Sequence, residues 1–150
     1  MVWGAISWNH KSALVVMDGT LTARRYHDEI LTSVAIPFGL ESVGPGFIFQ
    51  DDNARPHRAT IVSNFHDQNM EYVHMSWPSR SPDLNPIEHA WDQLGRAVYA
   101  RHPRNLQDLR HCLMEEWDAL PQYRIRRLIQ SMRRRRCECV ISAEGGMTRY

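Results

Sequence analysis

Residues 47–57 read FIFQDDNARPH, and their order decides how the surrounding chain is interpreted. The apolar run at 47–50 is typical of a short buried strand, and it leads directly into two aspartates, Asp51 and Asp52. Functional sites in α/β sheets usually lie at the edge where strand carboxyl ends and helix amino ends meet. Asp52 is therefore a candidate site residue. The alternative is a turn aspartate that accepts a hydrogen bond from its own backbone.

A second informative stretch, residues 77–91, reads WPSRSPDLNPIEHAW. Its proline-rich first part predicts a loop, and Asn85 followed by Pro86 predicts a helix start with an N-cap and a proline in the first turn. Glu88 then falls in that first turn. An aspartate and a glutamate at one sheet edge suit a hard cation such as Mg²⁺. The alternative for Glu88 is a capping-box role, because it lies three residues after the N-cap.

Working outward, the chain alternates strand and helix patterns before it becomes helical. Two strands joined by a polar turn are expected at 2–8 and 13–17. A helix capped by Thr22 is expected to run to about Val34, with Tyr26, Ile30 and Val34 on one face. Pro37 is expected to end this helix. Further elements are a loop at 39–46, a helix at 58–68, a strand at 72–75 and helices starting at Pro86, Asn105 and after Pro121. Apolar stripes predict the buried faces of these three last helices: Ile87, Ala90, Trp91, Leu94 and Val98; Leu106, Leu109, Leu113, Trp117 and Leu120; Ile125, Leu128, Ile129 and Met132. The order predicts a mixed α/β layer structure with a helical C-terminal extension.

The chain has 150 residues, of which 43% are hydrophobic, so it can bury the core of one domain. No apolar run approaches the roughly 18 residues of a membrane span. Three cysteines (Cys112, Cys137 and Cys139) without metal-ligand spacing favour a reduced, intracellular protein.

Charge is unevenly distributed along the chain. Residues 1–95 hold 6 basic and 11 acidic residues, whereas residues 96–150 hold 12 basic and 6 acidic residues. Arginine dominates at 121–136, where seven arginines occur without an acid, and arginine suits phosphate contacts. The alternatives are a solvated helix face and a genome rich in arginine codons. The candidates for DNA contact are Arg124, Arg127, Arg133, Arg134, Arg135 and Arg136.

The two motifs together resemble the second and third catalytic blocks of Tc/mariner-type DDE transposases. FQDDNARPH is followed by WPSRSPDLNPIE, and 35 residues separate Asp52 from Glu88. VWGAIS near the start, VVMDGTLTARRYHDEIL and the C-terminal CECVISAEGGMTRY also resemble that family, so the resemblance covers nearly the whole chain.

This resemblance implies an RNase H-like fold and cut-and-paste DNA transposition with two divalent ions, Mg²⁺ or Mn²⁺. By position, Asp52 matches the second catalytic aspartate, because the family places that residue directly before an asparagine, here Asn53. Glu88 matches the closing glutamate, and His57 is expected to orient the loop or pack beside the site. Strand alternation predicts that Asp51 faces the opposite side. The resemblance implies that the partners are double-stranded DNA and a second transposase subunit in a dimer. It also implies a nuclear location, which RRRR at 133–136 suggests independently.

The resemblance also implies missing parts. The family's first catalytic aspartate lies on a central strand upstream of VWGAIS, and helix-turn-helix DNA-binding domains precede it. We therefore expect residues 1–150 to form an incomplete catalytic domain, catalytically inactive when isolated. Without the central strand, we expect the 2–8 strand either to pair directly with the 47–50 strand or to be separated from it by a gap.

Two other functions are compatible with parts of the sequence. A non-catalytic, domesticated remnant that binds DNA or a transposase subunit would use the arginine-rich region. VVMDGTLT resembles the DxDGT signature of haloacid dehalogenase-like phosphatases, but Val16 stands where that chemistry needs an aspartate nucleophile two residues before Asp18.

Overall fold

The computed structural model describes residues 1–76, 82–132 and 141. The chain divides into two compact units, Met1–Arg80 and Ser81–Tyr150, and each is considered by itself. Helices and strands are both present, as the mixed α/β prediction requires. Part of the proline-rich loop (77–81), Arg133–Arg136, Cys137, Cys139 and residues 142–150 lie outside the described residues.

The first unit opens with the predicted pair of strands. β1 (Val2–Trp3) and β2 (Val15–Val16) are antiparallel, with Val2 opposite Val16, and an isolated bridge between Ile6 and Lys11 extends the pairing toward the turn. The buried Ser12 hydroxyl accepts a hydrogen bond from the Ala5 amide at 2.8 Å and donates to the Ala13 carbonyl at 2.9 Å. These bonds hold the two arms of the hairpin together where regular pairing is interrupted.

A continuous helical rod follows, made of α1 (Ala23–Arg25), η1 (Tyr26–Ala35) and α2 (Ile36–Ser42). The predicted Thr22 cap is confirmed, because its hydroxyl accepts from the Arg25 amide. The prediction that the helix ends at Pro37 is wrong. η1 is π-helical, and the Ile36 amide donates to the Leu31 carbonyl five residues back. The α-helical register restarts after it, so Pro37 lies in the first turn of α2, where a missing N–H group is tolerated.

The π-helical winding also changes which residues of η1 are buried. Tyr26, Ile30, Leu31 and Ala35 are buried, at alternating separations of four, one and four residues, whereas Val34 is only half-buried. The predicted face is therefore right for its first two residues and wrong for Val34, because wider turns repeat at four and five residues rather than three and four. These side chains form the main core of the unit with Met17, Leu21 and Val62.

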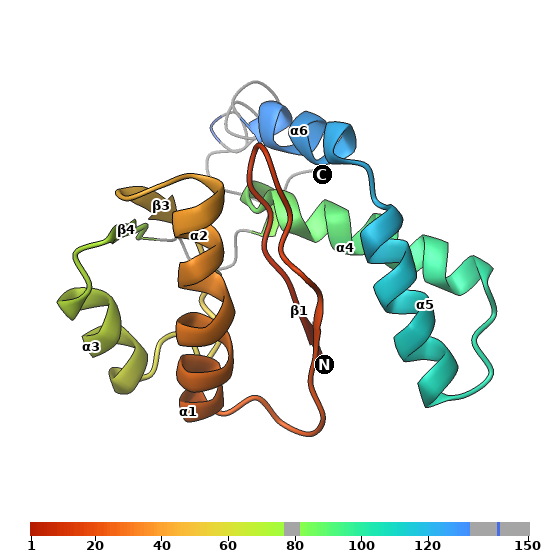
Figure 1. The fold of residues 1–150 in the computed structure, drawn as a ribbon, viewed down its shortest axis with the longest axis horizontal. Coiled ribbons are helices and arrows are strands. Elements are labelled where there is room, and N and C mark those ends of the chain that lie inside the picture. The colour runs from red at the N-terminus through yellow and green to blue at the C-terminus, as the bar shows by residue number, and fades with distance from the viewer. Residues whose placement is uncertain (77–81, 133–140, 142–150) are drawn as a thin grey trace. The chain divides into compact units, whose positions relative to one another are not determined.

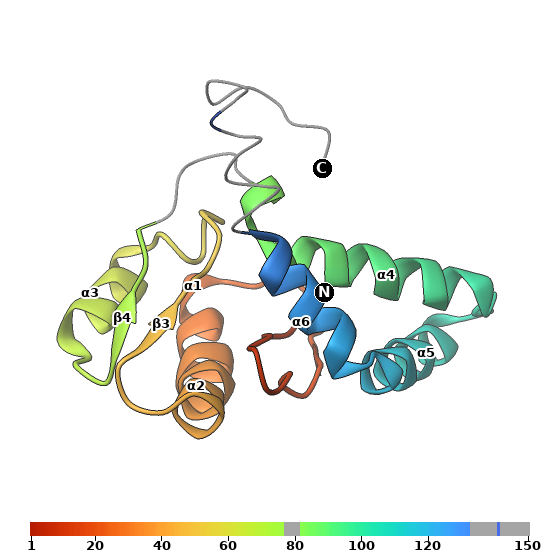
Figure 2. The same ribbon diagram turned by 90° about the horizontal axis from the view of Figure 1, so that it is seen from above.

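The rest of the unit is a parallel strand pair joined by a helix: β3 (Phe47–Phe49), α3 (Thr60–Gln68) and β4 (Tyr72–His74), all close to their predicted positions. Figures 1 and 2 show α3 and the α1–α2 rod beside this pair. Phe47 and Tyr72 are buried and face Ile36 of α2. Ile48 and Val73, on the other face, are 63% and 58% exposed.

Among the described residues, the strands form two separate pairs, β1–β2 and β3–β4. Direct pairing between the 2–8 and 47–50 strands is therefore not observed. The predicted gap between these two strands stays a prediction.

The second unit contains the short 3₁₀ turn η2 (Pro82–Leu84) and the helices α4 (Pro86–Ala100), α5 (Leu106–Ala119) and α6 (Gln122–Ser131). The predicted Asn85 cap is confirmed, because its Oδ1 accepts from the Ile87 amide at 3.3 Å. Asn105, predicted as the first residue of the next helix, is its N-cap, and its Oδ1 accepts from the Asp108 amide at 2.8 Å. α4 packs against both α5 and α6, and Trp91 stacks on Trp117 with ring centroids 5.0 Å apart.

Of the fourteen residues predicted to form the buried stripes of these helices, six are buried and seven are half-buried. The buried core residues of this unit are Ala90, Leu94, Val98, Cys112, Trp117, Leu120 and Ile125. Leu106, predicted to be on the buried stripe of α5, is instead 67% exposed because it begins the helix, before the packed turns. Within the described parts of the chain, every helix falls short of the length and apolarity that a membrane span requires.

Candidate functional site

The loop after β3 brings both aspartates to one imidazole. His57 Nδ1 lies 2.7 Å from Asp52 Oδ1 and 3.9 Å from Asp51 Oδ2. The prediction that Asp51 faces the opposite side is therefore wrong. Strand alternation does not apply to these residues, because β3 ends at Phe49 and residues 50–54 are irregular. The two side chains differ in burial instead: Asp51 is 8% exposed and Asp52 is 51% exposed.

Asp52 is held as an exposed, charged carboxylate. Its Oδ1 accepts a hydrogen bond from the Ala54 amide at 2.9 Å in addition to the contact with His57. The hydrogen bond from His57 lowers the pKa of Asp52; partial burial opposes this, and the Ala54 amide and the nearby imidazole add to the lowering. The turn alternative describes part of this geometry, since Asp52 does bond its own loop. That bonding also leaves a negative carboxylate facing solvent, as a cation ligand requires.

The contacts of His57 are those of a residue that holds this loop. Its ring stacks on Tyr26 with centroids 4.0 Å apart, and its amide donates to the Ala54 carbonyl at 2.9 Å. Burial, followed by the charges of Asp51 and Asp52, raises the pKa of Tyr26 well above its ordinary value, so the tyrosine stays neutral beneath the loop.

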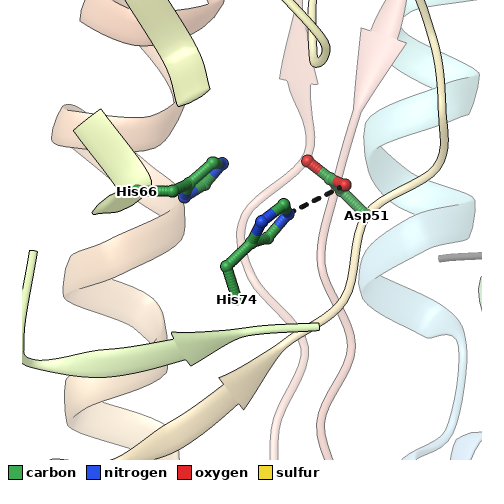
Figure 3. A group of neighbouring side chains, drawn as sticks. All are labelled: Asp51, His66 and His74. Carbon is green, nitrogen blue, oxygen red and sulfur yellow. Dashed lines mark hydrogen bonds and ion pairs between the residues drawn. The ribbon is translucent and has the colours of Figure 1, made fainter. Parts of the chain in front are cut away.

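A second group, which sequence reasoning missed, lies behind the loop. Asp51 Oδ1 is 3.3 Å from His74 Nε2, and Asp51 Oδ2 accepts from the Tyr26 hydroxyl at 3.4 Å. His66 of α3 stacks on His74 of β4 with centroids 3.8 Å apart and planes 6° from parallel. Figure 3 shows Asp51, His66 and His74 converging from three segments. One ligand atom from each lies within 4.8 Å of the others.

Burial controls the ionisation of this group. Burial raises the pKa of Asp51, and the neighbouring His57 and His74 oppose that rise. Burial, followed by the nearby His74 and His57, lowers the pKa of His66 to about 4, so its imidazole is neutral near neutral pH. His66 Nδ1 lies 2.5 Å from the Tyr72 hydroxyl oxygen. Its Nε2 is buried and has no hydrogen-bond partner in the described part of the chain.

Glu88 is exposed in the first turn of α4, directly after the Asn85 cap. Its amide donates to the Asn85 carbonyl at 3.2 Å. Asp52 and Glu88 belong to different compact units, so the sharing of an ion by their carboxylates stays a prediction.

The phosphatase motif has a different setting. Val16 is a β2 residue paired with Val2, and Asp18 follows in the exposed turn before Thr22, where its carbonyl accepts from Arg25 Nη1 at 2.8 Å. No nucleophile stands at position 16, and the structure adds no feature in favour of that chemistry. Of the six arginines proposed to contact DNA, Arg124 and Arg127 are described, and both are exposed on α6.

Residues 1–110 match the family described as DDE superfamily endonuclease. The chain is 36% identical over 151 residues to the Tc1 transposase of Caenorhabditis elegans and 34% identical over 150 residues to the Tcb1 transposase of Caenorhabditis briggsae. It is 28% identical over 152 residues to the Tc3 transposase of Caenorhabditis elegans. All three alignments cover 100% of this chain, but 54%, 54% and 45% of those proteins. The chain thus spans about half the length of the curated relatives it matches.

Proposed function

Because the chain belongs to the DDE superfamily of endonucleases, we propose that it forms the C-terminal half of a Tc/mariner-type transposase catalytic domain. The observation that carries this proposal is the similarity to Tc1-type transposases along the whole chain, including both motif blocks. The activity proposed for the complete domain is metal-dependent cleavage and joining of DNA strands.

The residues proposed to hold the divalent ions are Asp52 and Glu88. Both carboxylates are exposed, and Asp52 is kept ionised by His57 and the Ala54 amide, which suits Mg²⁺ or Mn²⁺. In such a site two ions, when bound, stabilise the attacking and leaving oxygens of a phosphoryl transfer. His57 acts as a positioning residue that fixes the Asp52 carboxylate, and Asn53 directly follows it. The carboxylates of this chain bind the ions and do not themselves attack DNA.

The proposed fold is RNase H-like, with a mixed sheet flanked by helices and a helical C-terminal extension. The parallel β3–β4 pair and the antiparallel β1–β2 pair are compatible with two parts of such a sheet. In this proposal the central strand of the family fold lies between β1 and β3. The exposed apolar residues Ile48 and Val73 are compatible with a sheet face that is covered in the complete domain.

Double-stranded DNA is the proposed partner, as transposon ends and as target, and the nucleus is the proposed location. Arg124 and Arg127 offer exposed guanidinium groups for phosphates. A dimer with a second transposase subunit is also proposed.

The alternative proposal is a non-catalytic remnant that binds DNA or a transposase subunit. The same arginines favour it, and it requires no complete metal site. The two proposals differ in whether Asp52 and Glu88 act together on a metal ion.

A paramagnetic metal titration tests that difference. Mn²⁺ is added to ¹⁵N-labelled protein, and the broadening of amide signals near Asp52 and Glu88 is followed. We expect the amide signals of both regions to broaden at the same Mn²⁺ concentration. The Asp52→Asn substitution should prevent the broadening around Glu88 as well as the broadening around residue 52. Broadening near Glu88 that is unchanged by Asp52→Asn would show separate sites and favour the remnant. The matched control is Asp67→Asn, which removes an exposed carboxylate at the end of α3.

A further inference from the structure

We propose that Asp51, His66 and His74 form a binding site for one transition-metal ion, with Zn²⁺ as its occupant. This site is distinct from the proposed Asp52–Glu88 ion site, and the inference does not rest on the proposed function. Its three ligands come from the loop after β3, from α3 and from β4.

The spacing of the donor atoms suits a tetrahedral ion. Zinc–ligand bonds of about 2.0–2.2 Å place neighbouring ligand atoms about 3.3–3.6 Å apart in a tetrahedron. Asp51 Oδ1 and His74 Nε2 are already 3.3 Å apart, and all three donor atoms lie within 4.8 Å of one another. The stacked rings of His66 and His74 bring both imidazoles to the same side of Asp51 (Figure 3). An ion lies in the plane of each imidazole that binds it, so binding requires the two rings, now 6° from parallel, to tilt apart.

The state of His66 is the second, independent observation. Its buried Nε2 has no hydrogen-bond partner among the described residues, and a buried polar atom left in this way destabilises the fold. When Nδ1–H donates to the Tyr72 hydroxyl at 2.5 Å, Nε2 carries a free lone pair. Metal-bound histidines typically donate their other N–H group to such a partner. In that tautomer Nε2 is available to a metal ion, and the Tyr72 hydroxyl is the outer partner of Nδ1.

The donor set decides the class of metal. Two imidazole nitrogens and one carboxylate suit Zn²⁺ and other late first-row ions, whereas Mg²⁺ prefers oxygen ligands. Three protein ligands leave a fourth position for water. A bound ion would also neutralise the buried Asp51 carboxylate and connect α3 and β4 to the loop that carries Asp52. Its role in this proposal is structural, because it fixes the loop that follows β3.

Co²⁺ tests the site directly, because tetrahedral Co²⁺ gives an intense visible absorption band that octahedral Co²⁺ lacks. Residues 1–150 are titrated with Co²⁺ alone, and Zn²⁺ is then added as a competitor. We expect a tetrahedral band that saturates at one equivalent and is abolished by one equivalent of Zn²⁺. His66→Asn and His74→Asn should each weaken Co²⁺ affinity at least 10-fold, by loss of a direct ligand.

Three controls make the result specific. His10→Asn removes an exposed imidazole in the hairpin turn and should leave the band unchanged. Asp52→Asn should also leave it, which separates this site from the proposed catalytic pair. Circular dichroism without metal checks folding; if His66→Asn unfolds, His74→Asn, at a half-buried position, decides the outcome. Failure of wild-type protein to give the band, or a band of equal affinity in folded His74→Asn, would overturn the proposal.

Discussion

His57 Nδ1 lies 2.7 Å from Asp52 Oδ1, and this contact closes the loop between β3 and α3. The imidazole is only 12% exposed, packed on Tyr26, whereas the carboxylate that it contacts is half exposed. A rigid, buried side chain thus fixes an accessible charged one. Pre-organisation of this kind is what a metal-binding carboxylate requires.

The first prediction concerns this contact. His57→Leu keeps an apolar side chain against Tyr26 but removes the hydrogen-bonding nitrogen, so the loop should open more often. We expect trypsin to cleave after the exposed Arg58 about five-fold faster, for a local stability loss of about 1 kcal/mol. Mass spectrometry of early digestion products measures the rate. Arg55, which precedes Pro56, is a poor trypsin site, so the product is unambiguous.

An unchanged rate of cleavage after Arg58 would mean that the loop is held without His57. His10→Leu is the matched control, because it places the same side chain at an exposed position in the hairpin turn and should leave cleavage after Arg58 unaltered.

The second prediction is that residues 1–150 neither cleave nor join transposon-end DNA in Mg²⁺ or Mn²⁺. The sequence supplies matches for two of the family's three carboxylates, Asp52 and Glu88, and the loss of one ligand weakens both ion binding and charge stabilisation in the transition state. Incubation with labelled duplex DNA and denaturing electrophoresis measure the outcome. Metal-dependent cleavage that Asp52→Asn abolishes would show that two carboxylates suffice.

Local signals in the sequence predicted most of the fold. Thr22 and Asn85 act as helix caps as expected, since a cap depends on a few neighbouring residues. The strands at 47–49 and 72–74 also follow from short apolar runs. The π-helical winding of η1 was not predicted, because the sequence of 26–35 also fits an α-helix. Packing of Tyr26, Ile30, Leu31 and Ala35 in the core accompanies the wider turn.

The candidate site was predictable only in part. The order of motifs along the chain places Asp52 after a strand and Glu88 after an N-cap, as the structure shows. The group formed by Asp51, His66 and His74 does not, because its members are up to 23 positions apart and meet only through the pairing of β3 with β4 and the packing of α3. No local pattern distinguishes His66 from an ordinary helix residue.

The third prediction concerns DNA binding by α6. The double variant Arg124→Ala/Arg127→Ala should bind any duplex sequence more weakly. If each arginine contacts one phosphate, the magnitude of the slope of log K (the DNA-binding constant) against log salt concentration should fall by about 2. Fluorescence anisotropy at several salt concentrations gives this slope. Arg96→Ala is the matched control, because Arg96 is exposed on α4 but already pairs with Asp92. An unchanged slope in the double variant would identify a merely solvated helix face.

The last prediction concerns the close contact between α2 and β3. A Cβ atom added at Gly39 would lie 2.2 Å from Cζ of the Phe47 ring, and Phe47 is itself buried. Gly39→Ala should therefore lower the free energy of unfolding by about 1–3 kcal/mol, despite the higher helix propensity of alanine. Gly95→Ala is the control: it lies inside α4 with no described atom within 4 Å of an added Cβ, so it should stabilise by about 0.5–1 kcal/mol. Urea unfolding followed by circular dichroism measures both.

In a Phe47→Leu background the cost of Gly39→Ala should shrink, because the ring that causes the clash is gone. An equal cost in both backgrounds would show that the Phe47 ring does not limit the size of residue 39.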